Sequence, residues 1–310
     1  MSSLTPNQIM EVKGRGFLRN RGTDNFSVRI VSNGAVFTAE DFENIAKLAK
    51  EFGNGKTICT SRLNVEVPGI PYDKIPEAEA FAKEHGLRFG GTGAKIRPIA
   101  ACKGTTCVFG NCDTHGIAKK LDEQFYMGWT NVKLPHKFKI TVGGCPNSCM
   151  KPSLNDFGVE GHKIPQYNAD KCRGCAKCAV ESACPVKAAK VENGKLVISD
   201  KCITCGVCVG KCPFEAVAHE GKQAFKIFVG GTWGKSSRNG TPLSKLVSEE
   251  EIYPLLEKSI LWYRENGYQK ERFGLAIDRI GIEKFEEAIF SDELLKRKDE
   301  ILAMELKTRE

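Results

Sequence analysis

The sequence contains no apolar run approaching the ~20 residues that a membrane-spanning helix requires. Its start, MSSLTPNQIM, has no basic stretch followed by an apolar one, so we expect no secretory signal. No G-x-G-x-x-G motif opens a helix after a strand, which argues against a nicotinamide or flavin site. The 46 Lys and Arg residues, against 38 Asp and Glu, are scattered rather than blocked, which disfavours nucleic-acid binding. We therefore expect a cytoplasmic protein without a membrane span or a nucleic-acid partner.

Cysteine is the residue type that the sequence has in excess. The chain has 310 residues, enough for about two domains at roughly 150 residues each. It contains 14 cysteines, although no export signal directs it to an oxidising compartment. Disulfides are rare in reducing compartments, so the cysteines are expected to bind metal.

Eight of the cysteines form two runs with the same rhythm. Each run has three cysteines spaced C-x2-C-x2-C and a fourth that is followed by proline. This repeat resembles the bacterial two-cluster ferredoxin, in which the fourth cysteine of each run ligates the other cluster. One departure is the gap of five residues before Cys184, where three are usual. Zinc ribbons also use C-x2-C pairs, but the third cysteine and the C-P ending favour iron–sulfur clusters. The resemblance implies one [4Fe-4S] cluster on Cys172, Cys175, Cys178 and Cys212, and another on Cys202, Cys205, Cys208 and Cys184.

Six cysteines remain, and two of them lie in the turn GGCPNSC as Cys145 and Cys149. A C-x3-C pair in a tight turn can hold two corners of a cluster, and the segment IAACKGTTCVFGNC can supply the other two. We prefer Cys102 and Cys107 for those corners, although Cys112 leaves the register of the upstream pair open. The two leftover cysteines, Cys59 and Cys112, are expected to be buried small side chains, since free cysteine is often buried.

These cysteines resemble the pattern of the sirohaem-dependent sulfite and nitrite reductases. The segments CKGTTC, LPHKFK, GGCPN and the downstream ferredoxin repeat carry the resemblance over nearly the whole chain. Cys102 and Cys107 are separated by one residue fewer than in the commonest form of the pattern. The resemblance implies a third [4Fe-4S] cluster and a sirohaem, with Cys149 as a thiolate shared between the two irons.

The same resemblance implies the residues of the anion site. Lys137 and Lys139 should point the same way from a strand over 137–142. The resemblance implies that these two lysines hold the substrate together with Arg29 and Arg97. Several fixed cations lower the energy of bringing a small oxyanion into a cleft. The alternative interpretations are that the two lysines form a solvated face of the strand and that the arginines form surface ion pairs. Two further residues are implied to bind the sirohaem, Arg62 and Asn147.

The implied activity is the six-electron reduction of sulfite to sulfide. Nitrite reduction to ammonia on the same cofactor is an alternative, because nitrite is also an oxyanion. A three-cluster electron carrier without haem is another alternative. Since the chain has no flavin fingerprint, the resemblance implies partner subunits that carry flavin and further iron–sulfur centres.

The expected fold class is α+β. It comprises a ferredoxin-like half-domain over 1–75, a sirohaem and cluster core over 76–165 and 219–310, and an inserted two-cluster ferredoxin domain over 166–218. A helix should begin at the capping box of Thr38 and Asp41, with Phe42, Ile45, Ala46, Ala49 and Phe52 on its buried face. A strand is expected over 58–67, and helices over 113–127 and from Ser248 onward. The charged tail after residue 296 is expected to be either a solvated helix or a docking arm.

Overall fold

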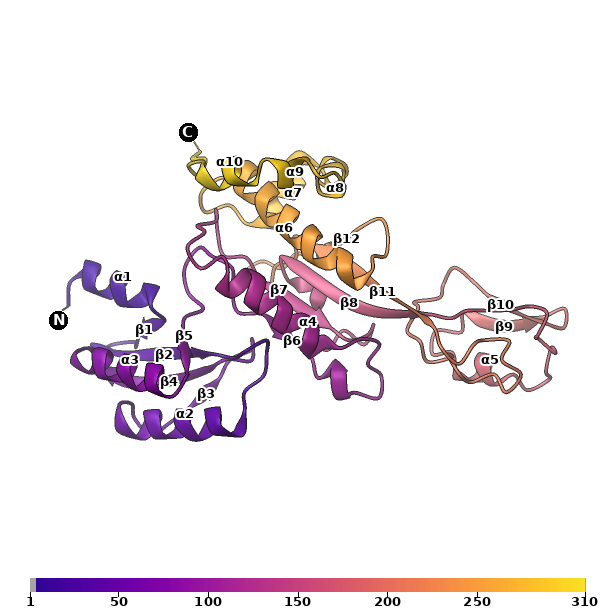
Figure 1. Cartoon of the computed structure of the whole chain (residues 1–310), viewed down its shortest axis with the longest axis horizontal. Helices are drawn as coiled ribbons and strands as arrows, with labels where there is room; N and C mark the ends of the chain where they lie inside the picture. Colours follow the sequence, from indigo (N-terminus) through magenta and orange to yellow (C-terminus); the bar gives the residue numbers. More distant parts are fainter. Residues whose placement is uncertain (1–3, 310) are drawn as a thin grey trace. The chain divides into compact units, whose positions relative to one another are not determined.

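The computed structural model describes residues 4–309, and it divides into two compact units, which we describe separately (Figure 1). The first unit takes in the chain through Ala100, His115–Ile140 and the chain from Ile260 onward. The second unit takes in Ala101–Thr114 and Thr141–Ser259.

An antiparallel sheet with two covering helices forms the N-terminal part of the first unit. Strand β2 is central, and β1, β4 and β5 all pair with it, while β3 pairs with β4. Phe26, Val28 and Ile30 of β2 are fully buried and Arg29 is half-buried, as strand alternation predicts. The elements of this part are α1 Pro6–Gly14, β1 Phe17–Arg19, β2 Asn25–Val31, α2 Ala39–Glu51, β3 Ile58–Cys59, β4 Val65–Pro71, α3 Ile75–Glu84 and β5 Arg88–Phe89.

Two details of this part differ from the sequence prediction. The segment expected as one strand over 58–67 is two strands, because Leu63 adopts a positive φ of 57° in the turn between β3 and β4. The capping box of Thr38 and Asp41 on α2 is confirmed. The predicted buried face of α2 is partly wrong, since Phe42 is 51% exposed and Leu48 is buried instead. Ala46 is also exposed.

The remainder of the first unit is helical and encloses an aromatic core. Phe138 contacts Tyr263 and Phe273, with ring centroids 6.0 and 5.1 Å away. The charged tail packs back on this unit, because Ile301 is buried and Lys307 forms a parallel bridge with Tyr268. The predicted helix over 113–127 is present as an α-helix continued by a π-helix over Asp122–Met127. The elements are α4 Thr114–Leu121, α6 Glu249–Asn266, α7 Phe273–Ile280, α8 Ile282–Phe290, α9 Glu293–Lys296 and α10 Lys298–Ala303; α6 belongs to this unit only from Ile260 onward.

The strand that was predicted over 137–142 begins only at Ile140. Before it, Phe138 makes an isolated parallel bridge with Ile96, donating its N–H to Lys95 at 3.0 Å and accepting that of Arg97 at 2.8 Å. The extended backbone still places Phe138 in the core, between the two lysines that flank it.

A second sheet organises the second unit, in the strand order β12-β11-β8-β7-β6. Strands β8 and β11 are antiparallel over their whole length, from Ile164 opposite Lys222 to Phe157 opposite Val229. The chain between these paired ends forms a small subdomain with its own core around Val180 and Leu196. The elements are β6 Ala100–Ala101, β7 Ile140–Gly143, β8 Phe157–Ile164, α5 Ala179–Ala183, β9 Ala189–Glu192, β10 Lys195–Ile198, β11 Lys222–Val229 and β12 Thr241–Pro242.

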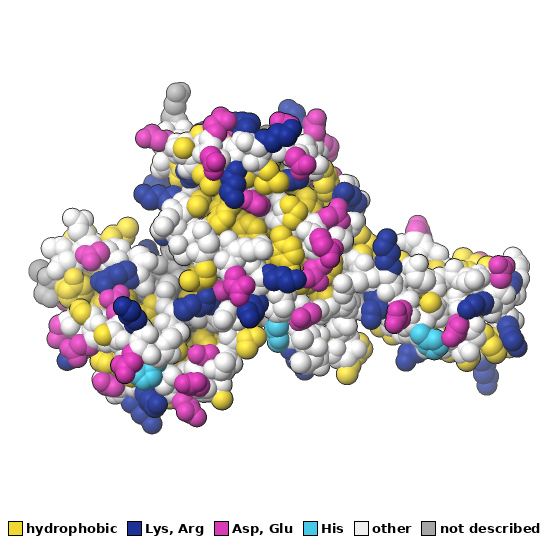
Figure 2. Space-filling view, in the orientation of Figure 1, with side chains coloured by type: hydrophobic (Ala, Val, Ile, Leu, Met, Phe, Trp, Pro, Cys, Tyr) yellow, Lys and Arg dark blue, Asp and Glu magenta, His cyan; other side chains and the backbone are white. Residues whose placement is uncertain are grey.

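The predicted α+β fold class is confirmed by these two sheets and their helices. Within residues 4–309, no helix is both long and apolar enough to cross a membrane. The visible face in Figure 2 carries Lys and Arg side chains among Asp and Glu, in keeping with the scattered charges of the sequence.

Candidate functional site

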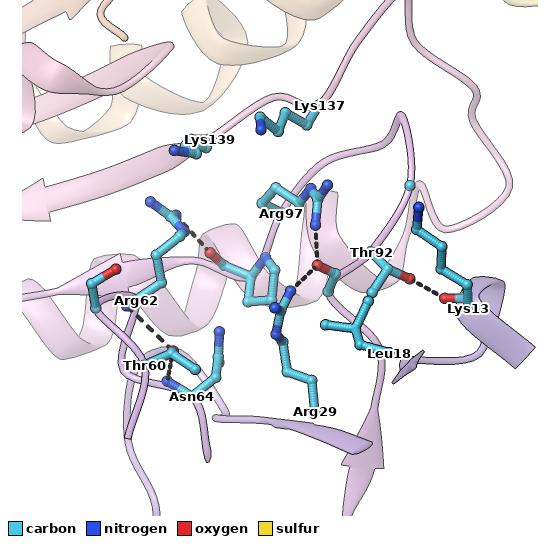
Figure 3. A pocket seen from close by; sticks show the side chains of 14 residues that line it. Lys13, Leu18, Arg29, Thr60, Arg62, Asn64, Thr92, Arg97, Lys137 and Lys139 are labelled. Atoms are coloured by element: carbon cyan, nitrogen blue, oxygen red, sulfur yellow. Dashed lines mark hydrogen bonds between the residues drawn. The ribbon is translucent and has the colours of Figure 1, made fainter. Parts of the chain in front are cut away.

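A cationic pocket of about 340 Å³ lies within the first unit (Figure 3). Six cationic side chains from five chain segments line it, and the lining residues in the described chain include no Asp or Glu. The sequence predicted five of these cations as site residues, and the structure brings all five together. They are Arg29, Arg62, Arg97, Lys137 and Lys139. Such a pocket favours a small anion, since opposite charges attract more strongly away from bulk water.

One backbone carbonyl orients two of the arginines. The Gly91 oxygen accepts a hydrogen bond from Nη1 of Arg29 at 2.7 Å and another from Nη1 of Arg97. Arg29 also donates from Nε and Nη2 to Oε1 of Glu66 at 2.9 and 2.7 Å. Both side chains of this ion pair are about one-fifth exposed, at 22% and 19%. The guanidinium groups are therefore fixed before any ligand arrives.

The turn that carries this carbonyl is itself held by the π-helix. Gly91 donates its N–H to the hydroxyl of Tyr126 at 3.1 Å. A Cβ on the preceding Gly90 would lie 2.7 Å from the same hydroxyl, so the two chain segments are in close contact. π-Helical turns are frequent at functional sites, and here the turn supports the orientation of Arg29 and Arg97.

Arg62 and Lys13 complete the wall of the pocket. Arg62 donates to the carbonyl oxygens of Pro98 at 2.9 Å and Ile140 at 3.0 Å. The sequence reasoning missed Lys13, whose carbonyl accepts a hydrogen bond from Thr92 at 2.5 Å. No local pattern marks Lys13, because it reaches the pocket from the end of α1.

The two lysines of the LPHKFK segment both line the pocket, while Phe138 between them is buried. His136, next to them, accepts the N–H of Lys137 at 2.7 Å through Nδ1. Burial, followed by the charges of Arg272, Lys137 and Arg97, lowers the pKa of His136 to about 4. His136 is therefore neutral near pH 7, as expected for an imidazole in a positive field.

A set of four cysteines lies within the second unit. Cys102 accepts the N–H of Gly144 at 3.1 Å through its sulfur. Burial and then the charges of Cys102, Cys149 and Cys107 raise the pKa of Cys145, against a hydrogen bond from the Asn147 backbone. Cys102, Cys107 and Cys149 therefore lie near Cys145. Cys149 and Asn147 are exposed on a turn in which Ser148 has a φ of 54°.

The two other cysteines outside the ferredoxin runs differ in their surroundings. Cys112 is buried beside Cys102 and Cys145, and burial followed by nearby negative charges raises its pKa to about 12. Cys59 is exposed on β3, so the expectation that it is buried is wrong.

One of the two predicted ferredoxin sets surrounds a small cavity. Cys184, Cys202, Cys205 and Cys208 line it together with apolar side chains. Burial and then the charges of the other three cysteines raise the pKa of Cys208 to about 11. Burial opposes ionisation of Cys184, but four backbone N–H groups lower its pKa overall. Four thiolates this close repel one another unless a cationic group lies among them, so the set fits an iron–sulfur cluster.

The second predicted ferredoxin set is Cys172, Cys175, Cys178 and Cys212. Cys172, Cys178 and Cys212 pack against the same small core as Leu196. Cys172 accepts the N–H of Leu196 at 3.3 Å, and backbone hydrogen bonds, that of Gly174 first, lower its pKa. All 14 cysteines are free. Among residues 4–309, no three His, Cys, Asp or Glu side chains are placed to share a single metal ion.

Comparison with known proteins agrees with this site. Residues 92–298 match the nitrite and sulphite reductase 4Fe-4S domain, and residues 19–85 match the nitrite/sulfite reductase ferredoxin-like half domain. The cationic pocket, the grouped cysteines and the matched 4Fe-4S domain define the class of iron–sulfur oxidoreductases. Within that class, the chain belongs to the nitrite and sulphite reductase family.

Three relatives illustrate the similarity. The chain is 31% identical over 286 residues to the coenzyme F420-dependent sulfite reductase of Methanocaldococcus jannaschii, covering 91% of this chain but only 44% of that protein. It is 30% identical over 292 residues to the C subunit of anaerobic sulfite reductase from Salmonella typhimurium, covering 87% and 84%. The crystal structure of dissimilatory sulfite reductase I superposes with a TM-score of 0.69 at 23% identity, covering 86% of this chain and 69% of that one. This last likeness shows the shared fold.

Proposed function

We propose that the chain is a catalytic subunit that reduces sulfite to sulfide, of the same type as the C subunit of anaerobic sulfite reductase. The observation that carries the proposal is the pocket of six cations without a lining carboxylate in the described chain, which suits a small oxyanion. Reduction of sulfite to sulfide consumes six electrons and six protons and releases three waters. The same cations suit nitrite, so nitrite reduction to ammonia is the second candidate, and the family includes both activities.

The residues of the pocket would bind and protonate the substrate. Arg29 and Arg97 are held by the Gly91 carbonyl and present fixed positive charge to an oxyanion. Lys137 and Lys139 would hold the anion and donate protons to its departing oxygens. The low pKa of His136 leaves it neutral, so it is not the proton donor near pH 7.

The cofactor roles follow from the donor chemistry of the residues. Guanidinium groups bind carboxylates well, so Arg62 would bind a sirohaem carboxylate. Bound sirohaem would supply an iron that takes up the substrate and passes electrons to it. Cys102, Cys107, Cys145 and Cys149 would hold one [4Fe-4S] cluster, with the exposed Cys149 shared with the sirohaem iron and Asn147 beside it.

The remaining cysteines would carry electrons inward through two more [4Fe-4S] clusters. The domain organisation we propose keeps 1–75 as the half-domain, 76–165 and 219–310 as the core and 166–218 as an insertion. Two observations support the insertion: the paired ends of β8 and β11, and the hydrogen bond of 3.0 Å from Ala218 N–H to the Gln166 carbonyl. The electron donor would be partner subunits carrying flavin and further iron–sulfur centres.

The test is a lysine substitution in anaerobically purified protein whose iron and extractable sirohaem are measured first. Lys137→Ala should abolish most sulfite turnover, with reduced viologen as donor, while the cofactor content stays at the wild-type level. Lys133→Ala is the matched control, because Lys133 is exposed on the same segment and does not line the pocket. Unchanged turnover in Lys137→Ala would refute the substrate site.

The cofactor measurement also separates the alternatives. Iron for three clusters without extractable sirohaem, from cells that make sirohaem, would instead indicate an electron carrier. With sirohaem present, the ratio of kcat/KM for sulfite and nitrite decides between the two substrates.

A further inference from the structure

Asn111 lies where three cysteine-bearing loops of the second unit meet. Its side chain is buried, with the residue only 8% exposed. Its backbone N–H donates to the Gly144 carbonyl at 2.8 Å. Its side-chain Nδ2 donates to the Cys205 carbonyl at 3.2 Å and to the Gly161 carbonyl at 3.4 Å. One residue therefore ties the loop of Cys107 and Cys112 to the loop before Cys145 and to the loop of Cys202–Cys208.

These bonds form a short connection between two cysteines of different sets. From Cys205, one hydrogen bond leads to the Asn111 side chain, and a second leads from the Asn111 backbone to Gly144. Gly144 is joined by its peptide bond to Cys145. The path from Cys205 to Cys145 therefore consists of covalent bonds and two hydrogen bonds, without a through-space jump.

Close packing holds this junction in place. A Cβ on Gly206 would lie 2.9 Å from Oδ1 of Asn111, and a Cβ on Gly161 would lie 2.7 Å from the sulfur of Cys112. Strand β8 anchors the same loop, because Lys163 donates its N–H to the Thr204 carbonyl at 2.9 Å. His162 adds a 2.6 Å hydrogen bond between its Nδ1 and the Thr204 hydroxyl.

The other ferredoxin set has different connections. In the described chain, Cys172 is hydrogen-bonded through its carbonyl to Lys195 at 2.9 Å and through its sulfur to Leu196 at 3.3 Å. The Cys178 carbonyl accepts from Ser182 at 2.9 Å. All of these partners lie inside the 166–218 segment. This set therefore has contacts to its own subdomain, whereas the Cys205 set also has contacts to the core.

We infer that Asn111 is the positioning residue that couples the Cys184, Cys202, Cys205 and Cys208 set to the Cys102, Cys107, Cys145 and Cys149 set. This inference rests on the proposed function. It fixes an order in which the Cys172 set receives electrons from outside and the Cys205 set delivers them to the core. Each transfer moves one electron, so the delivering cluster is oxidised by one unit and the receiving cluster is reduced by one. The reductant is a low-potential one-electron donor, and dithionite serves in the test.

The coupling is tested by Asn111→Ala in cluster-loaded protein without sulfite. After rapid mixing with dithionite, freeze-quench EPR follows how fast the core cluster becomes reduced. We expect transfer to slow by about tenfold, since small misplacements of reacting groups cost factors of this size. Gln223→Ala is the matched control: exposed Gln223 donates to the Asn111 carbonyl at 2.8 Å, at the same junction but off the connection, so its rate should stay at the wild-type value.

A second variant covers the case in which Asn111→Ala loses iron. Asn111→Asp keeps the size and the backbone bond but removes the donor to Cys205, and it should slow transfer as well. Wild-type rates in an iron-replete Asn111 variant, or equal slowing in Gln223→Ala, would overturn the inference. Failure of wild-type protein to reduce sulfite with reduced viologen would instead refute the proposed function.

The order is tested by redox potentials. Tyr167 packs against the same small core as Cys172 and Cys178, so it lies beside the receiving set. Reduction of the delivering cluster should broaden the EPR signal of the core cluster, whereas reduction of the receiving cluster should not. Tyr167→Phe should shift the reduction potential of the receiving cluster. A shift in the cluster that does broaden this signal would reverse the order.

Discussion

Gly91 offers the sharpest test of how the cationic pocket is built. It has a φ of +71°, and an added Cβ would lie 3.0 Å from Cδ of Arg29 and 3.1 Å from Cγ of Pro98. Gly91→Ala therefore adds two costs, the left-handed backbone and the contact with two neighbours. The first is about 1–2 kcal/mol for a residue with a Cβ. The second is about 1–3 kcal/mol, the usual range for overpacking.

The matched control isolates the contact from the backbone strain. Gly86 has a similar φ of +67°, but no atom lies within 4 Å of an added Cβ. Gly86→Ala should lower the free energy of unfolding by about 1–2 kcal/mol only. The free energies of unfolding of the two variants should differ by about 1–3 kcal/mol, which is the cost of the steric contact of the added Cβ with Arg29 and Pro98.

Function should separate the variants further. The Gly91 carbonyl accepts from Arg29 and Arg97, so moving it displaces both guanidinium groups. We expect the KM for sulfite to rise by about tenfold in Gly91→Ala, equivalent to about 1.4 kcal/mol, and to stay unchanged in Gly86→Ala.

Two assays suffice under anaerobic conditions. Urea unfolding is followed by tryptophan fluorescence, since Trp129 and Trp262 are buried in the first unit. Steady-state kinetics with reduced viologen gives KM. Equal losses of stability in the two variants, with unchanged KM in both, would refute the idea that Gly91 positions the arginines.

Three further outcomes are expected. His136 has a pKa of about 4 in the folded state and about 6.5 in the unfolded state, so the folded state binds fewer protons between these values. The free energy of unfolding should therefore fall as the pH drops from about 6.5 to 4. His136→Gln should reduce this pH dependence, measured as the midpoint of urea unfolding. Phe138→Ala should cost about 3–5 kcal/mol because the side chain is fully buried, whereas Phe109→Ala, which is 53% exposed, should stay within about 0.5 kcal/mol in the same titration. Cys112→Ala should keep the wild-type iron content, whereas Cys102→Ala should lose that of one cluster; loss of iron in the first variant would contradict our choice of ligands.

Only part of each cysteine set could be predicted from local spacing. Loops with a thiol at every third residue keep the three cysteines of one run near one another, whereas the fourth ligand of each set was assigned from family resemblance. The structure places Cys184, Cys202, Cys205 and Cys208 around one small cavity. The pocket cations were found through family resemblance rather than through pattern. Arg29 and Lys137 are far apart in sequence, and no periodicity brings them to one pocket.

The errors came from features that local patterns do not encode. Phe42 fits the helical stripe of α2, but Leu48 fills the core position because the sheet below sets which face is buried. The break between β3 and β4 depends on a positive φ at Leu63, a residue that rarely adopts one. Lys13 and the Gly91 carbonyl join the site only through tertiary contacts.

The antiparallel pair β8 and β11 has a consequence for the changes that the segment between them can tolerate. Ile164 and Lys222 are directly opposite each other, so the two junctions of the inserted segment lie about 5 Å apart. A short hairpin turn spans that distance, so the sheet needs nothing from the insertion to close. The segment between the two strands can therefore be changed in length or sequence while β8 and β11 keep their register.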